Sequence, residues 1–139
     1  RIATFAPCFL IQFCFSMSQQ PENISRMSEI TFSVGLNDNN IPVSLQWDAD
    51  DHPVKGKKTC KSVLIALWDG DTKNTLRIDL WTKDMEVNEM NHFFFQTLMT
   101  MSDTFERATA NTGLSQKMRE FARQFAAELQ LKPPTTGGK

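Results

Sequence analysis

The segment from residue 75 to residue 109 constrains the fold most, because the spacing of its apolar residues changes part-way along it. Leu76, Ile78 and Leu80 alternate with other residues, which is the two-residue period of a half-buried strand. From Met90 onward the apolar residues recur every three or four positions, as they do on one side of a helix. A strand that runs into a long helix predicts a fold of class α+β.

Two hairpins are predicted upstream of that helix. Apolar residues alternate over residues 30–36 and again over residues 41–47, and a turn-rich Asn-Asp-Asn-Asn separates the two runs. A four-residue loop would place Ile30 opposite Trp47 and Leu36 opposite Ile41. Pro42 has no N–H to donate, so the second strand either begins there or lies at an edge.

The second hairpin is predicted over residues 61–69 and 74–82, around the turn of residues 70–73. Its register would place Leu67 opposite Leu76 and Val63 opposite Leu80. A short apolar run is also compatible with a helix, so a helical reading of residues 60–68 stays open.

Two helices follow the strands. Asp84 is a candidate N-cap for the first, because carboxylates suit the positive end of the helix dipole. Gly113 is expected to end it, and a second helix begins at about Leu114. Helices joined by a short loop pack antiparallel. The prediction is ββββαα, an antiparallel sheet of two hairpins with two C-terminal helices packed on one face. The core would then join Leu76, Ile78 and Leu80 to the helix stripe (Met90, Phe94, Leu98, Met101, Phe105 and Ala108).

Three segments of the chain are predicted to differ in whether they are folded or disordered. Residues 1–27 form a hydrophobic and then polar extension, read as disordered or as an artefact of the start site. An atypical export signal and a genuine hydrophobic arm are the alternatives for this segment. Its apolar run is shorter than the roughly 20 residues that a membrane-spanning helix needs, so no integral membrane span is predicted. Residues 28–131 form the folded domain, and the tail of residues 132–139 is predicted to be disordered.

Composition argues against several classes of function. A formal net charge of -1 gives no basic excess for phosphates, so nucleic acid is not an expected partner. Three cysteines without a C-x-x-C pair favour neither a disulfide framework nor a zinc site. Asp69-Gly70-Asp71 begins like a calcium loop, but Asn74 and Leu80 replace the required Gly and Glu. We therefore expect no metal, no cofactor and no catalytic residues.

Large side chains without a place in the predicted core indicate a binding surface. On the outer face of the second hairpin these are Leu64, Trp68, Arg77, Asp79 and Trp81. Arg77 is expected to stack on either indole ring.

The consecutive Phe93, Phe94 and Phe95 span about 200° of a helix, so one stripe against the sheet cannot bury all three. Either the second helix covers one flank, or Phe93 or Phe95 contacts a partner. The alternative to protein binding is a small apolar ligand or lipid, held in a pocket lined by Met90, Phe94, Met101 and Phe105.

Several strings resemble GldC, a gliding motility-associated protein family of Bacteroidetes bacteria. They are SEITFSVGL, the WD of residues 68–69, TLRIDLWTKDM, FFFQTL and MSDTFERAT, and the likeness covers about residues 28–131. The resemblance implies a soluble, non-enzymatic, cytoplasmic accessory protein. Its expected partners are protein components of the gliding machinery or a second copy of itself. The resemblance carries no catalytic residue over to this chain.

Overall fold

The computed structural model describes residues 23–131 and confirms the α+β class, with strands before helices. Its elements are β1 (Ile30–Leu36), β2 (Pro42–Ala49), β3 (Lys58–Cys60), β4 (Ser62–Asp69), β5 (Asn74–Trp81), α1 (Val87–Thr109) and α2 (Thr112–Glu128). Most of the predicted N-terminal extension and all of the predicted tail lie outside the described residues. Those two predictions stay untested.

The strands form two antiparallel sheets, where the sequence suggested one. β2 lies between β1 and β3 in the first sheet, and β4 pairs with β5 in the second. Lys61 is the bend that separates β3 from β4, and its carbonyl accepts a hydrogen bond from the Thr82 N–H at 2.8 Å. The Lys83 N–H also donates to the Pro42 carbonyl at 2.9 Å. The two sheets are therefore joined at this corner, and residues 62–69 form a strand rather than the alternative helix.

The second hairpin has the predicted register. Leu67 lies opposite Leu76, Ile65 opposite Ile78 and Val63 opposite Leu80. The Asp69 carboxylate accepts a hydrogen bond from the Asp71 N–H at 2.9 Å and from the Thr72 hydroxyl at 2.7 Å. Asp69 therefore stabilises the turn by the usual Asx geometry.

The predicted register of the first hairpin is wrong by two residues. Phe32 lies opposite Trp47 and Val34 opposite Leu45, because the loop covers residues 37–41 instead of 37–40 and β2 carries a bulge. Gly35 faces Ser44 whereas Leu36 faces Pro42, so Val43 is the extra residue. A shift of two keeps every side chain on its own face, which is why the alternation still identified both strands. As predicted, β2 begins at Pro42.

Both predicted helix boundaries are wrong by a few residues. α1 is capped at Glu86 rather than Asp84, and the Glu86 N–H donates to the Glu89 carboxylate at 2.9 Å. The chain leaves α1 at Ala110, which has a φ of 55°, and not at Gly113. The Asn111 side chain then caps α2 by accepting from the Leu114 N–H at 3.0 Å. Gly113 therefore lies in the first turn of α2.

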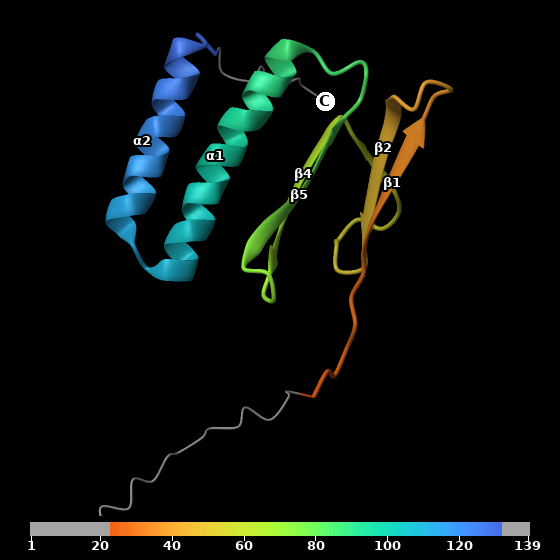
Figure 1. Ribbon diagram of the computed structural model, residues 1–139, viewed down its shortest axis with the longest axis horizontal. Helices are drawn as coiled ribbons and strands as arrows, with labels where there is room; N and C mark the ends of the chain where they lie inside the picture. Colours follow the sequence, from red (N-terminus) through yellow and green to blue (C-terminus); the bar gives the residue numbers. More distant parts are fainter. Residues whose placement is uncertain (1–22, 132–139) are drawn as a thin grey trace, which may run out of the picture.

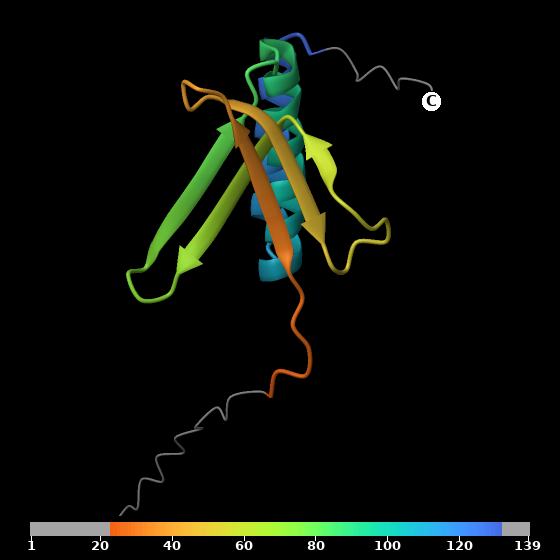
Figure 2. The ribbon, with the colours of Figure 1, turned by 90° about the vertical axis from the view of Figure 1, so that its right-hand side faces the viewer.

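The helices lie to one side of the strands (Figure 1). α1 lies between the strands and α2, so α2 packs on α1 instead of on the sheet. Figure 2 shows the two hairpins diverging from their shared corner like an inverted V, with the helices behind them. Within the described residues the buried apolar side chains are Leu45 in the first sheet and Ala122 in α2. The interior therefore has two separate parts. One is the corner between the sheets, around Leu45, and the other is the contact between α1 and α2, around Ala122, which we call the helix seam.

Candidate interaction surface

The outer face of the second hairpin is open to solvent, as the sequence suggested. Trp68 is 66% exposed and Trp81 is 53% exposed, and Arg77 and Asp79 are exposed between them. Leu64 is half-buried and lines a groove beside α1. We call Leu64, Trp68, Arg77, Asp79 and Trp81 the hairpin outer face.

The two indole rings of this face do not form one cluster. Trp68 lies opposite Thr75 at the turn, whereas Trp81 lies opposite Ser62 at the corner. Six residues of strand separate the two positions, or about 20 Å. Arg77 pairs with Asp79 at 3.5 Å instead of stacking on a ring. The hairpin outer face therefore offers two separate aromatic contacts with an exposed ion pair between them.

The three consecutive phenylalanines point to three different surroundings. Phe93 is half-buried in the groove between α1 and the strands. Phe95 is half-buried and lies seven residues from the fully buried Ser102, so it shares that face of α1. Phe94 is 45% exposed and its ring meets that of Phe93 edge-on, with centroids 5.9 Å apart. The exposed member of the triplet is thus Phe94, and neither of the two residues selected from the sequence.

The apolar stripe of α1 does not form the predicted core with the strands. Met101 is 47% exposed, and on β5 Leu76 and Ile78 are 55% and 47% exposed. Residues 94, 98, 101 and 105 follow one line along the helix, and that line continues onto α2. We call this surface the helix flank, made of Phe94, Leu98, Met101, Phe105, Leu114, Met118 and Phe121.

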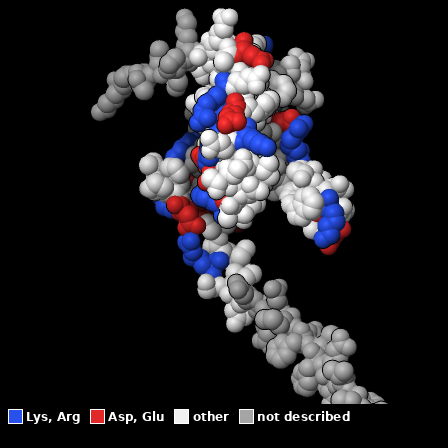
Figure 3. All heavy atoms as spheres, turned by 90° about the vertical axis from the view of Figure 1, so that its left-hand side faces the viewer, with Lys and Arg blue, Asp and Glu red and all other residues white. Residues whose placement is uncertain are grey.

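The helix flank contains a shallow groove between the two helices. Its volume is about 350 Å³, and it is lined by Leu98, Phe105, Leu114, Lys117, Met118 and Phe121. Leu114 and Phe121 are 47% and 58% exposed. Figure 3 looks onto the helix side and shows an uncharged area in its middle, with charged side chains around it. Such a surface resembles the apolar centre and polar rim of a protein interface.

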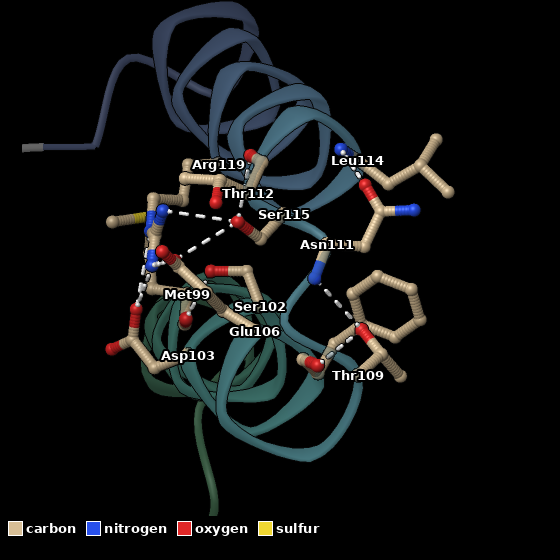
Figure 4. Close-up of polar contacts among 11 residues, drawn as sticks. Met99, Ser102, Asp103, Glu106, Thr109, Asn111, Thr112, Leu114, Ser115 and Arg119 are labelled. Carbon is tan, nitrogen blue, oxygen red and sulfur yellow. Dashed lines mark hydrogen bonds and ion pairs between the residues drawn. The ribbon is translucent and has the colours of Figure 1, made fainter.

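A polar clamp on another side of the helix pair fixes the helix flank in place (Figure 4). Arg119 of α2 contacts Asp103 of α1 at 2.8 Å and also pairs with Glu106. The Ser115 hydroxyl donates to the Glu106 carboxylate at 2.9 Å. Ser102 is fully buried beside this clamp, and small residues there let the two backbones approach closely. The polar clamp is Ser102, Asp103, Glu106, Ser115 and Arg119.

The charges of the polar clamp shift one another's proton affinity. The hydrogen bonds from Arg119 and then Ser115 hold the pKa of Glu106 below its ordinary value. Hydrogen bonds to Asp103 and Glu106 raise the pKa of Arg119 in turn. Both shifts favour the charged forms, so the clamp is an ion pair at neutral pH. Its role is structural, because it orders the two helices whose other side is the helix flank.

Sequence reasoning did not find the polar clamp. Ser115 and Arg119 are four residues apart, and Asp103 and Glu106 are three apart, which places each pair on one side of its helix. Opposite charges at helical spacing on two neighbouring helices were therefore a usable signal. The spacing does not reveal which side of each helix faces the other, so the apolar stripe was taken for the contact.

The described residues contain no feature that indicates a metal site or a membrane span. Within residues 23–131, no three His, Cys, Asp or Glu side chains gather as metal ligands would. Neither α1 nor α2 combines the length and the apolar character needed to cross a bilayer. Burial raises the pKa of the half-buried Cys60 thiol, which disfavours the reactive thiolate.

Comparison with known proteins gives one match. A family model described as "Gliding motility-associated protein GldC-like" matches residues 42–131. No curated protein and no solved structure matches the chain. The matched range begins with β2 and runs past the end of α2, so it contains the hairpin outer face, the helix flank and the polar clamp.

Proposed function

Since the chain belongs to the GldC-like family of gliding motility-associated proteins, we propose that it is a non-enzymatic accessory protein of the gliding apparatus. In this proposal it acts by binding other proteins of that apparatus, and it does so in the cytoplasm. The family supplies the cellular process. The exposed surfaces supply the argument for protein binding.

One observation carries the proposal: the described domain leaves most of its large apolar side chains in contact with water. Leu45 and Ala122 are the buried apolar residues, at 3% and 0% exposure. Both hairpins and both helices carry large apolar side chains that are more than a third exposed. Buried apolar surface contributes about 25 cal/mol per Å², so an open domain of this kind gains free energy when a partner covers it. Extended exposed apolar surface marks protein contact sites.

Two surfaces suit this role in different ways. The helix flank is broad and apolar, and its Phe and Met side chains adapt to a partner's shape. The hairpin outer face is narrower, with Trp68 and Trp81 as isolated anchors and the Arg77–Asp79 pair between them. Trp and Arg are common among the residues that dominate binding free energy. We propose the helix flank as the main contact surface and the hairpin outer face as the second.

The groove of the helix flank also fits a non-enzymatic role. The groove of the helix flank is lined mostly by apolar residues, with Lys117 as its charged member. An active site needs several polar groups that converge on one reacting atom. The lining instead suits a contact with an apolar protein surface.

Capture from native gliding cells tests the proposal. The tagged full-length chain is compared with Phe121→Ser, Trp81→Ala and the matched control Arg123→Gln, which is exposed on the same helix as Phe121. We expect a gliding component with the wild type and the control, and a reduced amount with Phe121→Ser. If Phe121→Ser captures as much as the wild type and has an intact circular dichroism spectrum, the contact does not lie on the helix flank. Capture of no gliding component by the wild type would contradict the proposed function.

A small apolar ligand is the second candidate, and one groove favours it. This groove has a volume of about 430 Å³ and lies between the strands and α1, with Phe32, Trp47, Ile65 and Phe93 in its lining. Of the residues proposed from the sequence, Met90, Phe94, Met101 and Phe105, none lines it. Fatty acid titration followed by indole fluorescence tests this candidate, with Phe93→Ala as the variant that should weaken binding.

A further inference from the structure

We propose that the free edge of β1 is a docking site for a second copy of this chain, with the two β1 strands paired antiparallel about Ser33. The inference rests on the proposed function, since it assumes that exposed apolar surface is there to be covered by protein. It goes further by naming the partner and the register. Within the described residues, β1 ends its sheet and pairs on one side only, with β2.

The backbone of β1 presents hydrogen-bonding groups outward at known positions. The Glu29 carbonyl accepts from the Asp50 N–H at 3.1 Å, so the backbone groups of Glu29 point toward β2. Direction alternates along a strand, so the groups of Ser33 also point toward β2, whereas those of Phe32 and Val34 point to the free edge. A second strand can therefore bond to the even-numbered residues of β1.

When two β1 strands pair antiparallel with Ser33 at the centre, apolar side chains of one copy lie opposite apolar side chains of the other. In that register Phe32 of one copy faces Val34 of the other, and Ile30 faces Leu36. All four apolar residues then lie on one face of the joined sheet, and both pairs use outward-pointing backbone groups. Ser33 faces Ser33 in the pair without hydrogen bonds. A two-fold interface requires this kind of self-complementarity.

The edge of β1 has no protection against such pairing. Residues 30–36 read Ile-Thr-Phe-Ser-Val-Gly-Leu, with no charge and no proline. Natural edge strands usually carry Lys, Pro or an inward charge that prevents pairing with another chain. The other sheet has two strands, so β4 and β5 are both edges. Arg77 and Asp79 provide such charges on β5, whereas β4 carries a charge only at its last residue, Asp69. β1 therefore lacks the charges that protect β5.

The exposed area is of the right order for a dimer. Ile30, Phe32, Val34 and Leu36 are 67%, 44%, 38% and 54% exposed. Together they present roughly 400 Å², about half of the ~800 Å² that each partner of a standard interface buries. The backbone of the two paired strands adds to this area.

Disulfide trapping tests the register in the full-length chain with Cys8, Cys14 and Cys60 changed to Ser. Ser33→Cys would place two thiols on facing Cα atoms about 4.5 Å apart, within the range a disulfide spans. Thr31→Cys is the matched control on the same strand and face. In the proposed register Thr31 faces Gly35, which places the two Thr31 positions about 14 Å apart. We expect mild oxidation to link Ser33→Cys almost completely and Thr31→Cys at least tenfold less.

Light scattering on the unmodified chain tests the dimer itself. We expect a dimer that Ile30→Lys weakens at least tenfold, while Val54→Lys, a change at a 62% exposed loop residue, leaves it intact. A monomer at all concentrations overturns the inference. A dimer that resists Ile30→Lys and fails to link through Ser33→Cys also overturns it. A monomer that still captures a gliding component leaves the proposed function standing, whereas a dimer that captures none contradicts the proposed function alone.

Discussion

Lys61 Nζ lies 2.8 Å from Glu89 Oε1, so the bend between β3 and β4 is tied directly to the first turn of α1. The same ammonium group lies 3.7 Å from Asp84 Oδ2 on the connection between β5 and the helix. This exposed ion pair joins the start of α1 to the bend between the two sheets, and pairs of this kind each contribute only a small part of the stability.

Low pH is expected to weaken the ion pair between Lys61 and Glu89. The Lys61 hydrogen bond holds the pKa of Glu89 below its ordinary value, and Glu89 raises the pKa of Lys61 in return. A lowered carboxylate pKa contributes stability above the unfolded-state pKa and loses it as the pH falls through the folded-state pKa. The raised pKa of Lys61 keeps its contribution until the pH rises well into the alkaline range. Thermal unfolding should show the wild-type midpoint falling below about pH 5. The unfolding midpoint of Glu89→Gln should fall less over that pH range. An equal fall of the midpoint in both proteins would exclude the Lys61–Glu89 ion pair as its cause.

A larger side chain at the contact between the two helices should destabilise the domain. Ala122 is fully buried, and overpacking of a tight site costs about 1–3 kcal/mol. Ala122→Leu is therefore expected to lower the free energy of unfolding by about 2 kcal/mol. Ala127→Leu, at an exposed position of the same helix, is the control and should change it by less than about 0.5 kcal/mol. Chemical denaturation measures both, and similar values would mean that the helices are not closely packed at Ala122.

The polar clamp should depend on the arginine at position 119. Arg119→Met removes the partner of Asp103 and Glu106 and leaves the half-buried Glu106 carboxylate with the Ser115 hydroxyl alone. We expect a lower unfolding midpoint than for Arg123→Met, which removes an exposed charge from the same helix. The pKa of Glu106, followed by NMR titration, should rise toward its ordinary value in Arg119→Met. An unchanged pKa would show that the clamp does not form in solution.

Two tryptophans should respond differently to truncation. Trp47 is half-buried, its ring meets His52 edge-on at 5.1 Å, and Lys58 Nζ lies 5.1 Å from its centroid. Trp47→Ala is expected to destabilise the domain by about 3 kcal/mol. Trp81→Ala, on the hairpin outer face, should cost less than about 1 kcal/mol and instead reduce partner binding or self-association. If pull-down and light scattering of Trp81→Ala match the wild type, the hairpin outer face is not a contact surface.

The sequence predicted the elements better than their contacts. Strict alternation identified β4 and β5 and their register, because the loop around Asp69 is a regular turn without a bulge. The first hairpin is shifted by two residues, one from a longer loop and one from the bulge at Val43, and alternation encodes neither feature. The apolar stripe of α1 was recognised, but its environment was not. Small residues such as Ser102 and Ala122 form the real seam, and a hydrophobic pattern gives such residues little weight.

The candidate surfaces were predictable to a similar degree. Strand parity places Trp68, Arg77, Asp79 and Trp81 on one face of the hairpin, as the sequence defines. Leu76 and Ile78 on the opposite face are 55% and 47% exposed, so parity alone does not tell which face is covered. The helix flank was assigned to the core instead, because apolar stripes usually pack inward. Its exposure follows from the position of α1 between α2 and the strands, which is a tertiary property (Figure 1).

Gliding speed in cells that carry Phe94→Ser and Phe121→Ser together tests the central claim most directly. Both side chains are exposed on the helix flank, at 45% and 58%, so the protein should fold and accumulate to its usual level. We predict that these cells lose most of their gliding, while cells with Arg123→Gln on the same helix glide normally. Normal gliding by the double variant, at a normal protein level, would contradict the claim that the helix flank is the contact surface through which this protein acts.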